Sequence, residues 1–307
     1  MALIGLSVLI PTFNEELNLE DCLVSVCGWA GDIHVVDSFS TDGTSSIAKR
    51  YGARVVQHSY EGPAQQKNWA LENINFASDW VLILDADERV PLELQQEIEG
   101  IIAAGGNGYD GFYLNRRFIF YGKWIKHCGW YPNWNLRFFK HRLGRYEQRD
   151  IHEHVILEGS AGYCRRDLIH EDLRDLTHWI AKHNRYAIFE AAENYRTLLG
   201  TDQTGFSPSF IKGPLERKRA LKNRILIRLP VPVRSLLFFS YMYFLHLGFL
   251  DGIRGFHFCA MHAIFEYFYG IKLWELRNYK QGAPEGGIVA PRTFQAPPPS
   301  ETQGLKN

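Results

Sequence analysis

Apolar residues gather in four short runs before residue 90, and longer polar or mixed segments separate them. The runs are residues 6–10, 32–37, 53–57 and 80–84. Near-continuous apolar runs of this length predict strands that are buried on both faces, as in parallel sheets. Segments of helical length lie between the runs, at residues 16–29, 44–51 and 63–73. This alternation predicts an α/β fold with a Rossmann-like, mostly parallel, doubly wound sheet.

Polar side chains follow three of the four runs, at the points where the predicted strands end. The polar segments are residues 11–15, 37–44 and 85–89. The carboxyl ends of parallel strands meet at one edge of a sheet, and doubly wound sheets bind their ligands there. The sequence therefore predicts a binding site at this edge.

The rest of the chain divides by composition. Residues 173–199 carry apolar side chains at helical spacing and predict a long amphipathic helix, after which a loop rich in Gly, Ser and Thr begins. We therefore expect a first domain over residues 1–200 and a basic, aromatic helical region over residues 201–280. Repeated Pro, Gly and Ser make residues 281–307 typical of a disordered tail.

The helical region combines a basic cluster with two aromatic-rich apolar runs. The cluster has one acidic residue, Glu216, against the basic residues Lys212, Arg217, Lys218, Arg219, Lys222, Arg224, Arg228 and Arg234. A spanning helix needs about 20 predominantly apolar residues. The run at 235–250 is too short, and the run at 256–274 contains polar residues. We expect amphipathic helices that associate with the cytoplasmic face of the inner or plasma membrane, as in a peripheral or monotopic protein. Core helices and true spanning helices are the alternatives.

Overall charge and cysteine content narrow the possible partners. The 34 Lys and Arg residues balance the 34 Asp and Glu residues, which argues against a nucleic-acid partner. The five cysteines form no CxxC pair, so we expect free thiols in a reducing compartment. The N-terminal apolar run has neither a basic segment before it nor a small-residue cleavage site, and it predicts a first core strand instead of a signal peptide.

Two carboxylates, Asp85 and Asp87, follow the fourth run at positions i and i+2. They can share one divalent cation, Mg²⁺ or Mn²⁺, and such a cation suits the neutralisation of a departing diphosphate. A solvated turn or a helix cap is the alternative. Asp37, at the end of the second run, is placed to accept hydrogen bonds from a nucleotide base or ribose. The sequence contains no GxGxxG or P-loop pattern, which argues against a dinucleotide cofactor.

The polar segments also carry a family resemblance in their order along the chain. The segments are PTFNEE at 11–16, VDSFSTDGT at 36–44, QKNWA at 66–70, LDADER at 84–89 and WYPNWNLRFF at 130–139. Together they resemble the signatures of family 2 glycosyltransferases with the GT-A fold. The resemblance extends to bacterial β-glycosyltransferases that build lipopolysaccharide core or related surface glycans. It implies that residues 1–200 are a GT-A catalytic domain.

This resemblance implies a reaction and a set of site residues. The reaction is inverting transfer from a nucleotide-diphosphate sugar, in first place a UDP-sugar, to a glycan or lipid-linked acceptor. The residues implied in donor binding are Pro11, Thr12, Asn14, Glu15, Asp37, Lys67 and Asp85. Asp87 is expected at the metal, with Asp85 nearer the ribose and His170 either completing the metal shell or serving the structure. Arg137 is expected to contact the diphosphate or acceptor, or to form a structural ion pair.

Inversion also requires a base that deprotonates the acceptor hydroxyl. The Glu-Asp pair that often supplies it in this family is not found at the expected distance. Glu153 is the preferred candidate and Asp150 the alternative. Two other functions are weighed: a sugar nucleotidyltransferase, which would normally show a Gly-rich phosphate loop, and a catalytically inactive glycan-binding or membrane scaffold protein. The presence of Asp85, Asp87 and Glu153 argues against the latter.

Overall fold

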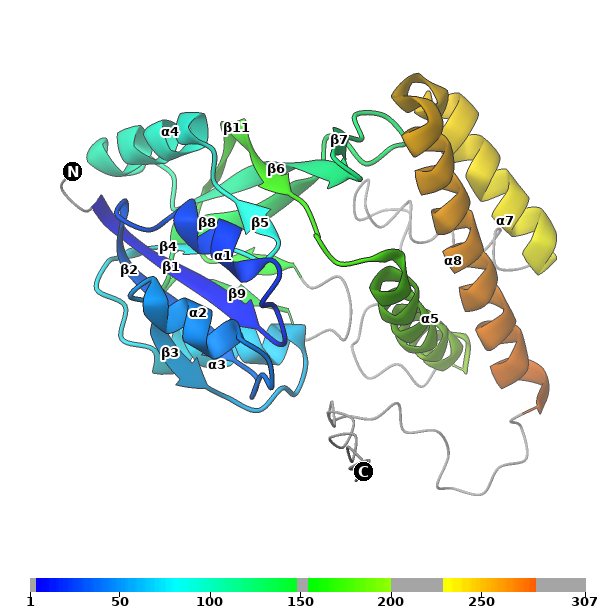
Figure 1. Cartoon of the computed structure of the whole chain (residues 1–307), viewed down its shortest axis with the longest axis horizontal. Helices are drawn as coiled ribbons and strands as arrows, with labels where there is room; N and C mark the ends of the chain where they lie inside the picture. The colour runs from blue at the N-terminus through cyan, green and yellow to red at the C-terminus, as the bar shows by residue number, and fades with distance from the viewer. Residues whose placement is uncertain (1–3, 148–153, 200–228, 280–307) are drawn as a thin grey trace, which may run out of the picture.

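The computed structural model describes residues 4–147, 154–199 and 229–279. In Figure 1 a twisted sheet with helices on both faces forms one side of the molecule, and a group of long helices forms the other. Glu153 and Asp150 lie outside the described residues, as do the basic residues 212–228 and the tail from residue 280 onward.

The central sheet is mixed, with a parallel half and a largely antiparallel half. Its order is β3 (Arg54–Gln57), β2 (Ala30–Asp37), β1 (Ile4–Thr12), β4 (Trp80–Ile83), β8 (Trp134–Lys140), β6 (Gly111–Phe120), β11 (Ala161–His170) and β5 (Glu88–Arg89). The first four strands are parallel and match the four predicted runs. β8 is antiparallel to both of its neighbours, and β11 is parallel to β6. The α/β prediction is confirmed, and the sheet is less uniform than the doubly wound pattern implies.

Smaller strands and four helices complete this part of the molecule. The strands are β7 (Lys123–Trp124), which pairs with β6, and the separate pair β9 (Gly144–Tyr146) and β10 (Val155–Leu157). The helices are α1 (Leu19–Val24), α2 (Thr44–Arg50), α3 (Pro63–Asn73) and α4 (Leu92–Ala103). α1 is shorter than the predicted helix at 16–29, because Asn18 donates from its backbone and side chain to Glu15 and forms a turn there.

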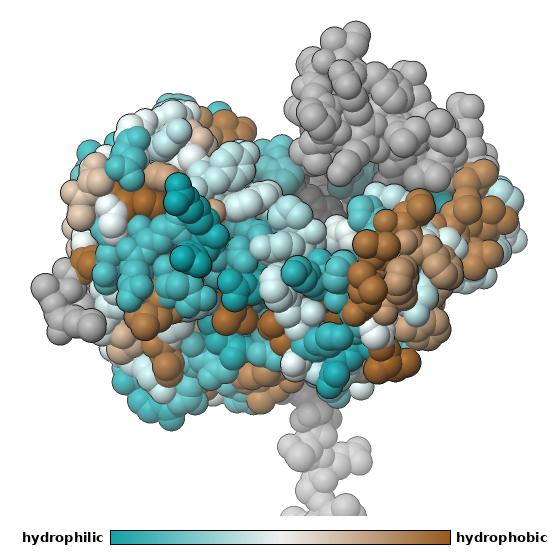
Figure 2. All heavy atoms as spheres, turned by 90° about the horizontal axis from the view of Figure 1, so that it is seen from above, coloured by the Kyte–Doolittle hydropathy of each residue, from teal (hydrophilic) through white to brown (hydrophobic). Residues whose placement is uncertain are grey.

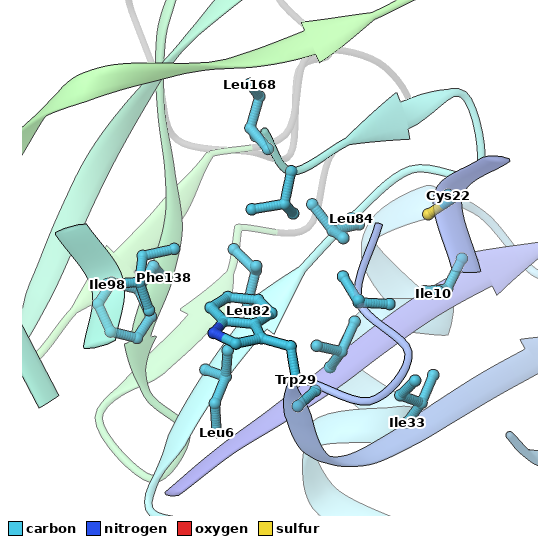
Figure 3. Packing of buried hydrophobic residues seen from close by; sticks show 14 of the residues in the cluster. Leu6, Ile10, Cys22, Trp29, Ile33, Leu82, Leu84, Ile98, Phe138 and Leu168 are labelled. Atoms are coloured by element: carbon cyan, nitrogen blue, oxygen red, sulfur yellow. The ribbon is translucent and has the colours of Figure 1, made fainter. Parts of the chain in front are cut away.

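The buried core holds β4 in a fixed position. All four residues of β4 are buried. On one face Leu82 packs with Trp29, Ile98 and Phe138, as Figure 3 shows. On the other face Ile83 packs with residues of α3 and β8. The loop that follows β4 therefore leaves the best-packed part of the sheet.

The C-terminal part of the molecule is helical, as the sequence predicts. It contains α5 (Leu176–Leu199), α7 (Val231–Ser240), the π-helix η2 (Tyr241–Leu245), the 3-10 helix η3 (Gly248–Asp251) and α8 (Gly252–Tyr279). α8 lies between α5 and α7 (Figure 1). No single helix among the described residues is long and apolar enough to cross a membrane. The segments Val231–Leu245 and Gly248–Tyr279 meet the criteria of length and composition only as a pair bent by 71°.

Aromatic packing joins α8 to the sheet. The Phe258 ring lies 5.3 Å from the ring centres of both Phe118 and Trp130, and the His262 ring lies 4.7 Å from Trp130. The thiols of Cys128 and Cys259 meet beside them, 3.4 Å apart. All five cysteines are free, as predicted. The inner face of α8 is thus part of the core.

Buried His262 and the neighbouring half-buried His183 of α5 make stability depend on pH. Burial, reinforced by nearby His183, lowers the pKa of His262 to about 3, and burial lowers the pKa of His183 to about 4. The unfolded chain takes up these protons near pH 6.5, so folding excludes them between that pH and the lowered values. We expect the free energy of unfolding to decrease as pH falls below 6.5, by up to roughly 1.4 kcal/mol per pH unit for each histidine.

Urea unfolding at pH 7.5 and pH 5 measures this effect. His262→Phe should lose the share of the pH dependence due to one histidine, while His257→Phe, on the exposed face of the same helix, should keep it. Equal pH dependence in both variants would contradict the assignment.

Candidate active site

Asp85 lies two residues after the end of β4, and two buried cations hold its carboxylate. Arg137 Nη2, from β8, lies 2.6 Å from Asp85 Oδ2, and Lys67 Nζ, from α3, lies 3.7 Å from Oδ1. Burial alone would raise the pKa of Asp85, but these two positive charges outweigh it and hold that pKa well below its usual range. Of the two readings of Arg137 from the sequence, the ion pair is observed.

Glu88 is a residue of this cluster that sequence reasoning missed. Its side chain is fully buried, and Oε2 accepts a hydrogen bond from the backbone N–H of Asp85 at 2.9 Å. Oε1 lies 3.3 Å from Arg116 Nη1 and 3.6 Å from Arg137 Nη2. Glu88 therefore fixes the backbone of the acidic loop and joins it to the cations of β6 and β8. The charged segment at 84–89 was visible in the sequence, but not the inward direction of this side chain.

Asp87 points to the other side of the loop, toward β11. His170 Nε2, at the end of β11, lies 3.3 Å from Asp87 Oδ2. Burial alone would raise the pKa of Asp87, but the charge and hydrogen bond of His170 outweigh it and keep that pKa low. The pairing of β5 with β11 places His170 opposite Glu88, which holds the two predicted metal ligands together.

The donor set suits a cation that takes part of its ligands from a substrate. The described residues contain no group of three or more His, Cys, Asp or Glu side chains arranged around a metal position. Mg²⁺ in phosphate-binding sites typically uses one or two protein carboxylates and completes its shell with phosphate oxygens and water. Asp87 and His170 fit this pattern. Both oxygens of Asp85 face cations, which favours Asp87 as the metal contact.

The predicted nucleotide residues lie together at the ends of β1 and β2. Asp37 is fully buried, and its Oδ1 accepts a hydrogen bond from Thr12 Oγ1 at 3.1 Å. Its Oδ2 accepts one from the backbone N–H of Ser40 at 3.0 Å. Asn14 accepts a hydrogen bond from the backbone N–H of Thr41, 2.9 Å away, and its backbone is left-handed, with φ of 53°. These contacts tie the two loops to each other, in addition to any contact with a nucleotide. Pro11 lies in β1, opposite Val36 of β2.

Glu15 connects the nucleotide loop to the segment after β11. Its Oε1 lies 2.9 Å from Arg174 Nη1, and its Oε2 accepts a hydrogen bond from Asn18 at 2.9 Å. Burial raises the pKa of Glu15 to about 7, against the opposing charge of Arg174. The binding role predicted for Glu15 therefore has to coexist with an ion pair to Arg174.

Two cations near Asp87 come from the C-terminal half of the chain and were also missed. Arg174 holds Asp172 through two hydrogen bonds of 2.7 and 2.8 Å, and Lys182 Nζ, on α5, lies 3.7 Å from the same carboxylate. Burial would lower the pKa of Lys182, but the negative charge of Asp87 outweighs it and raises that pKa. These cations add positive charge beside the predicted diphosphate position.

A shallow recess lies next to His170. Its lining residues are Arg116, Phe118, Trp130, Asn133 and His170. The recess combines aromatic faces with a cation and an amide. Arg116 and Asn133 contact each other at 3.4 Å, which fixes one wall.

Removal of Asp85 tests the charge balance of this cluster. In Asp85→Ala the buried cations Arg137 and Lys67 lose their partner. The Asp85 side chain is 32% exposed, so solvent screens part of the pair, and we expect a stability loss of about 2–4 kcal/mol in urea unfolding. Glu20→Ala removes the exposed pair with Arg50 and should cost far less, because solvent screens that pair. Equal losses in the two variants would refute the proposed balance.

Comparison with known proteins shows similarity to glycosyltransferases. A family model described as "Glycosyl transferase family 2" matches residues 7–170. The chain is 30% identical over 214 residues to the "Lipopolysaccharide core biosynthesis glycosyltransferase LpsC" of Rhizobium meliloti, which covers 67% of this chain and 75% of the relative. It is 44% identical over 99 residues to an uncharacterized glycosyltransferase of Rickettsia bellii, which covers 32% of this chain and 33% of that relative.

Solved structures similar to this chain include two with a bound nucleotide sugar. One is the mannosyltransferase PcManGT from Pyrobaculum calidifontis in complex with GDP-Man and Mn²⁺, with a TM-score of 0.49, 17% identity and coverage of 89% of this chain and 88% of that chain. The other is S. aureus TarS in complex with UDP-GlcNAc, with a TM-score of 0.44, 14% identity and coverage of 89% and 92%. The family match, which covers more than half of the chain, and the relative from Rhizobium meliloti together identify this protein as a glycosyltransferase of family 2.

Proposed function

We propose that this glycosyltransferase transfers a sugar, with inversion, from a nucleotide-diphosphate donor to a glycan or lipid-linked acceptor of the cell envelope. UDP-sugars are the first donors to test. The observation that carries the proposal is the pairing of Asp87 with His170 beyond the carboxyl end of β4, next to Asp85 and its two buried cations, Lys67 and Arg137. The name of the relative from Rhizobium meliloti supports lipopolysaccharide core as the first acceptor class.

The charges of the site suit a leaving nucleoside diphosphate. Asp87 and His170 would hold Mg²⁺ or Mn²⁺. Such an ion, when bound, neutralises negative charge on the departing phosphate oxygens. Lys182 lies on the same side as Asp87 and adds a fixed positive charge there. The ion pairs of Asp85 with Arg137 and Lys67 keep the loop in place during this change in charge.

Inverting transfer is a single displacement at the anomeric carbon. The acceptor oxygen forms its bond to C1 as the bond between C1 and the diphosphate oxygen breaks. The electron pair leaves with the diphosphate, and the proton of the acceptor hydroxyl goes to a carboxylate base. We propose Glu153 as this base, with Asp150 as the alternative.

Removal of Asp87 tests the metal and donor site. We expect calorimetry to detect UDP binding in the presence of Mn²⁺ and a large loss of affinity with a chelator. Asp87→Ala should lose the metal-dependent part of binding and lower turnover by about 100-fold or more. Glu20→Ala, at an exposed carboxylate in α1, serves as the control. Full activity in Asp87→Ala would refute the metal role, and failure to bind any nucleoside diphosphate would refute the donor assignment.

The two candidate bases can be separated by kinetics. Glu153→Gln should reduce kcat for sugar transfer to truncated lipopolysaccharide by about 10²–10⁴-fold, because a general base contributes this much, while UDP binding stays unchanged. Asp150→Asn should leave kcat within a few-fold of the wild-type value. The opposite result would exchange the two roles, and unchanged kcat in both variants would exclude both carboxylates.

A further inference from the structure

The helices α7, η2, η3 and α8 bury one apolar face, but they also bury carboxylates and expose many large apolar side chains, which is unusual. Large apolar side chains here are among the most exposed of the described residues: Leu245 is 75% exposed, and Leu236 and Ile253 are each 66% exposed. In contrast, Asp251 and Glu266 are 3% and 7% exposed. In ordinary core helices of a water-soluble domain, such apolar side chains would be buried and the carboxylates would be exposed.

The exposed apolar residues form a continuous surface around the bend between α7 and α8. We call this surface the apolar face; its residues are Leu236, Leu237, Phe244, Leu245, Phe249, Leu250, Ile253 and Phe256. Tyr243 links the segments, because its ring lies within 5.2–6.2 Å of the rings of Phe244, Phe249 and Phe256. Figure 2 shows hydrophobic residues gathered on the side of the molecule where these helices lie. A contiguous exposed surface of this kind marks an interaction site.

Polar contacts between α7 and α8 hold the two helices together. Arg234 Nε, on α7, lies 2.7 Å from Glu266 Oε1, on α8, and the guanidinium lies over the ring of Tyr269. Gly270 allows this close approach, since a Cβ there would lie 2.4 Å from Arg234 Nη2. The ion pair fixes α7 against α8, so the apolar face is a permanent part of the fold.

The charge around the apolar face identifies its partner. Between residues 231 and 268 the carboxylates are Asp251 and Glu266, and both are buried, so this stretch exposes no carboxylate. Arg254 is exposed beside Ile253. The preceding segment 212–228 has seven basic residues and one acidic residue in its sequence. An apolar surface that exposes an arginine and no carboxylate, and that a basic segment precedes in the sequence, matches the boundary of an anionic lipid leaflet, where acyl chains lie beneath negative headgroups.

We propose that the apolar face docks on an anionic lipid bilayer, with η2, η3 and the adjoining turns of α7 and α8 in the headgroup region. The expected membrane is the cytoplasmic leaflet of the inner or plasma membrane. Since the inner face of α8 packs on Phe118 and Trp130, which line the recess beside His170, docking brings the recess close to the lipid surface. Use of that recess by a lipid-linked acceptor rests on the proposed function, but the docking does not.

Vesicle flotation of the full chain tests the docking. We expect the wild-type protein to float with vesicles of phosphatidylglycerol and phosphatidylcholine and to bind more weakly to phosphatidylcholine alone. Leu245→Glu/Ile253→Glu should reduce partition by at least about tenfold, because it places two charges where apolar side chains enter the lipid. The matched control is Val24→Glu/Leu92→Glu, at positions of 58% and 63% exposure on α1 and α4.

The variants must keep the wild-type melting temperature and UDP binding, which shows that they fold. If Leu245→Glu/Ile253→Glu does not fold, Leu245→Gln/Ile253→Gln takes its place in the experiment. Wild-type protein that stays unbound would overturn the proposal, as would a Leu245/Ile253 variant that floats like the wild type. A wild-type dimer that becomes a monomer in the variant, without vesicle binding, would assign the face to a second copy instead. Flotation needs no sugar transfer, so its failure is distinct from failure of the glycosyltransferase proposal.

Discussion

Neutralisation of the acidic loop after β4 is the constraint on which the rest of the site depends. Asp85, Asp87 and Glu88 stand within four residues at the end of a buried strand, where unpaired charges would be expensive. Cations from three other elements meet them: Lys67 from α3, Arg116 from β6 and Arg137 from β8. At an effective dielectric constant of 20, two opposite charges 4 Å apart attract by about 4 kcal/mol, enough to offset part of their desolvation. Strands β6 and β8 therefore contribute arginines to the site in addition to forming the sheet.

The parallel half of the fold could be predicted because its signals are local. Four apolar runs became β1 to β4, and the Pro-led segment at 63–73 became α3. The antiparallel half gave no comparable signal. β6 has many half-buried positions and β11 several exposed ones, and both strands carry arginines. Their pairing depends on contacts between residues about 50 positions apart. Periodicity within one segment contains no information on such pairing.

The candidate site also has a part that the sequence predicted and a part that it did not. Asp87 and His170 were predicted as metal ligands from motif and resemblance, and the structure brings them within 3.3 Å of each other. The ion pair between Glu15 and Arg174 joins residues 159 positions apart, and no pattern around either residue indicates it. Asp37 shows a further limit of prediction from sequence. Its residue type and position predicted a nucleotide contact, whereas the observed hydrogen bonds of its side chain hold the surrounding loops. Residue type and strand position identify the edge of the sheet where the site lies. Which residues there contact a ligand and which hold the loops depends on tertiary contacts.

The two faces of α8 also set different rules for how this helix can change in evolution. The proposed lipid surface has no fixed shape to match, so docking as proposed would let Ile253 and Phe256 exchange with other apolar residues at little cost. The inner face has no such freedom. A Cβ on Gly255 would lie 2.2 Å from the carbonyl oxygen of Gly248, and one on Gly270 would meet Arg234. Sequence variation among relatives should therefore follow the helical period, with chemical character retained on one side and atomic shape on the other.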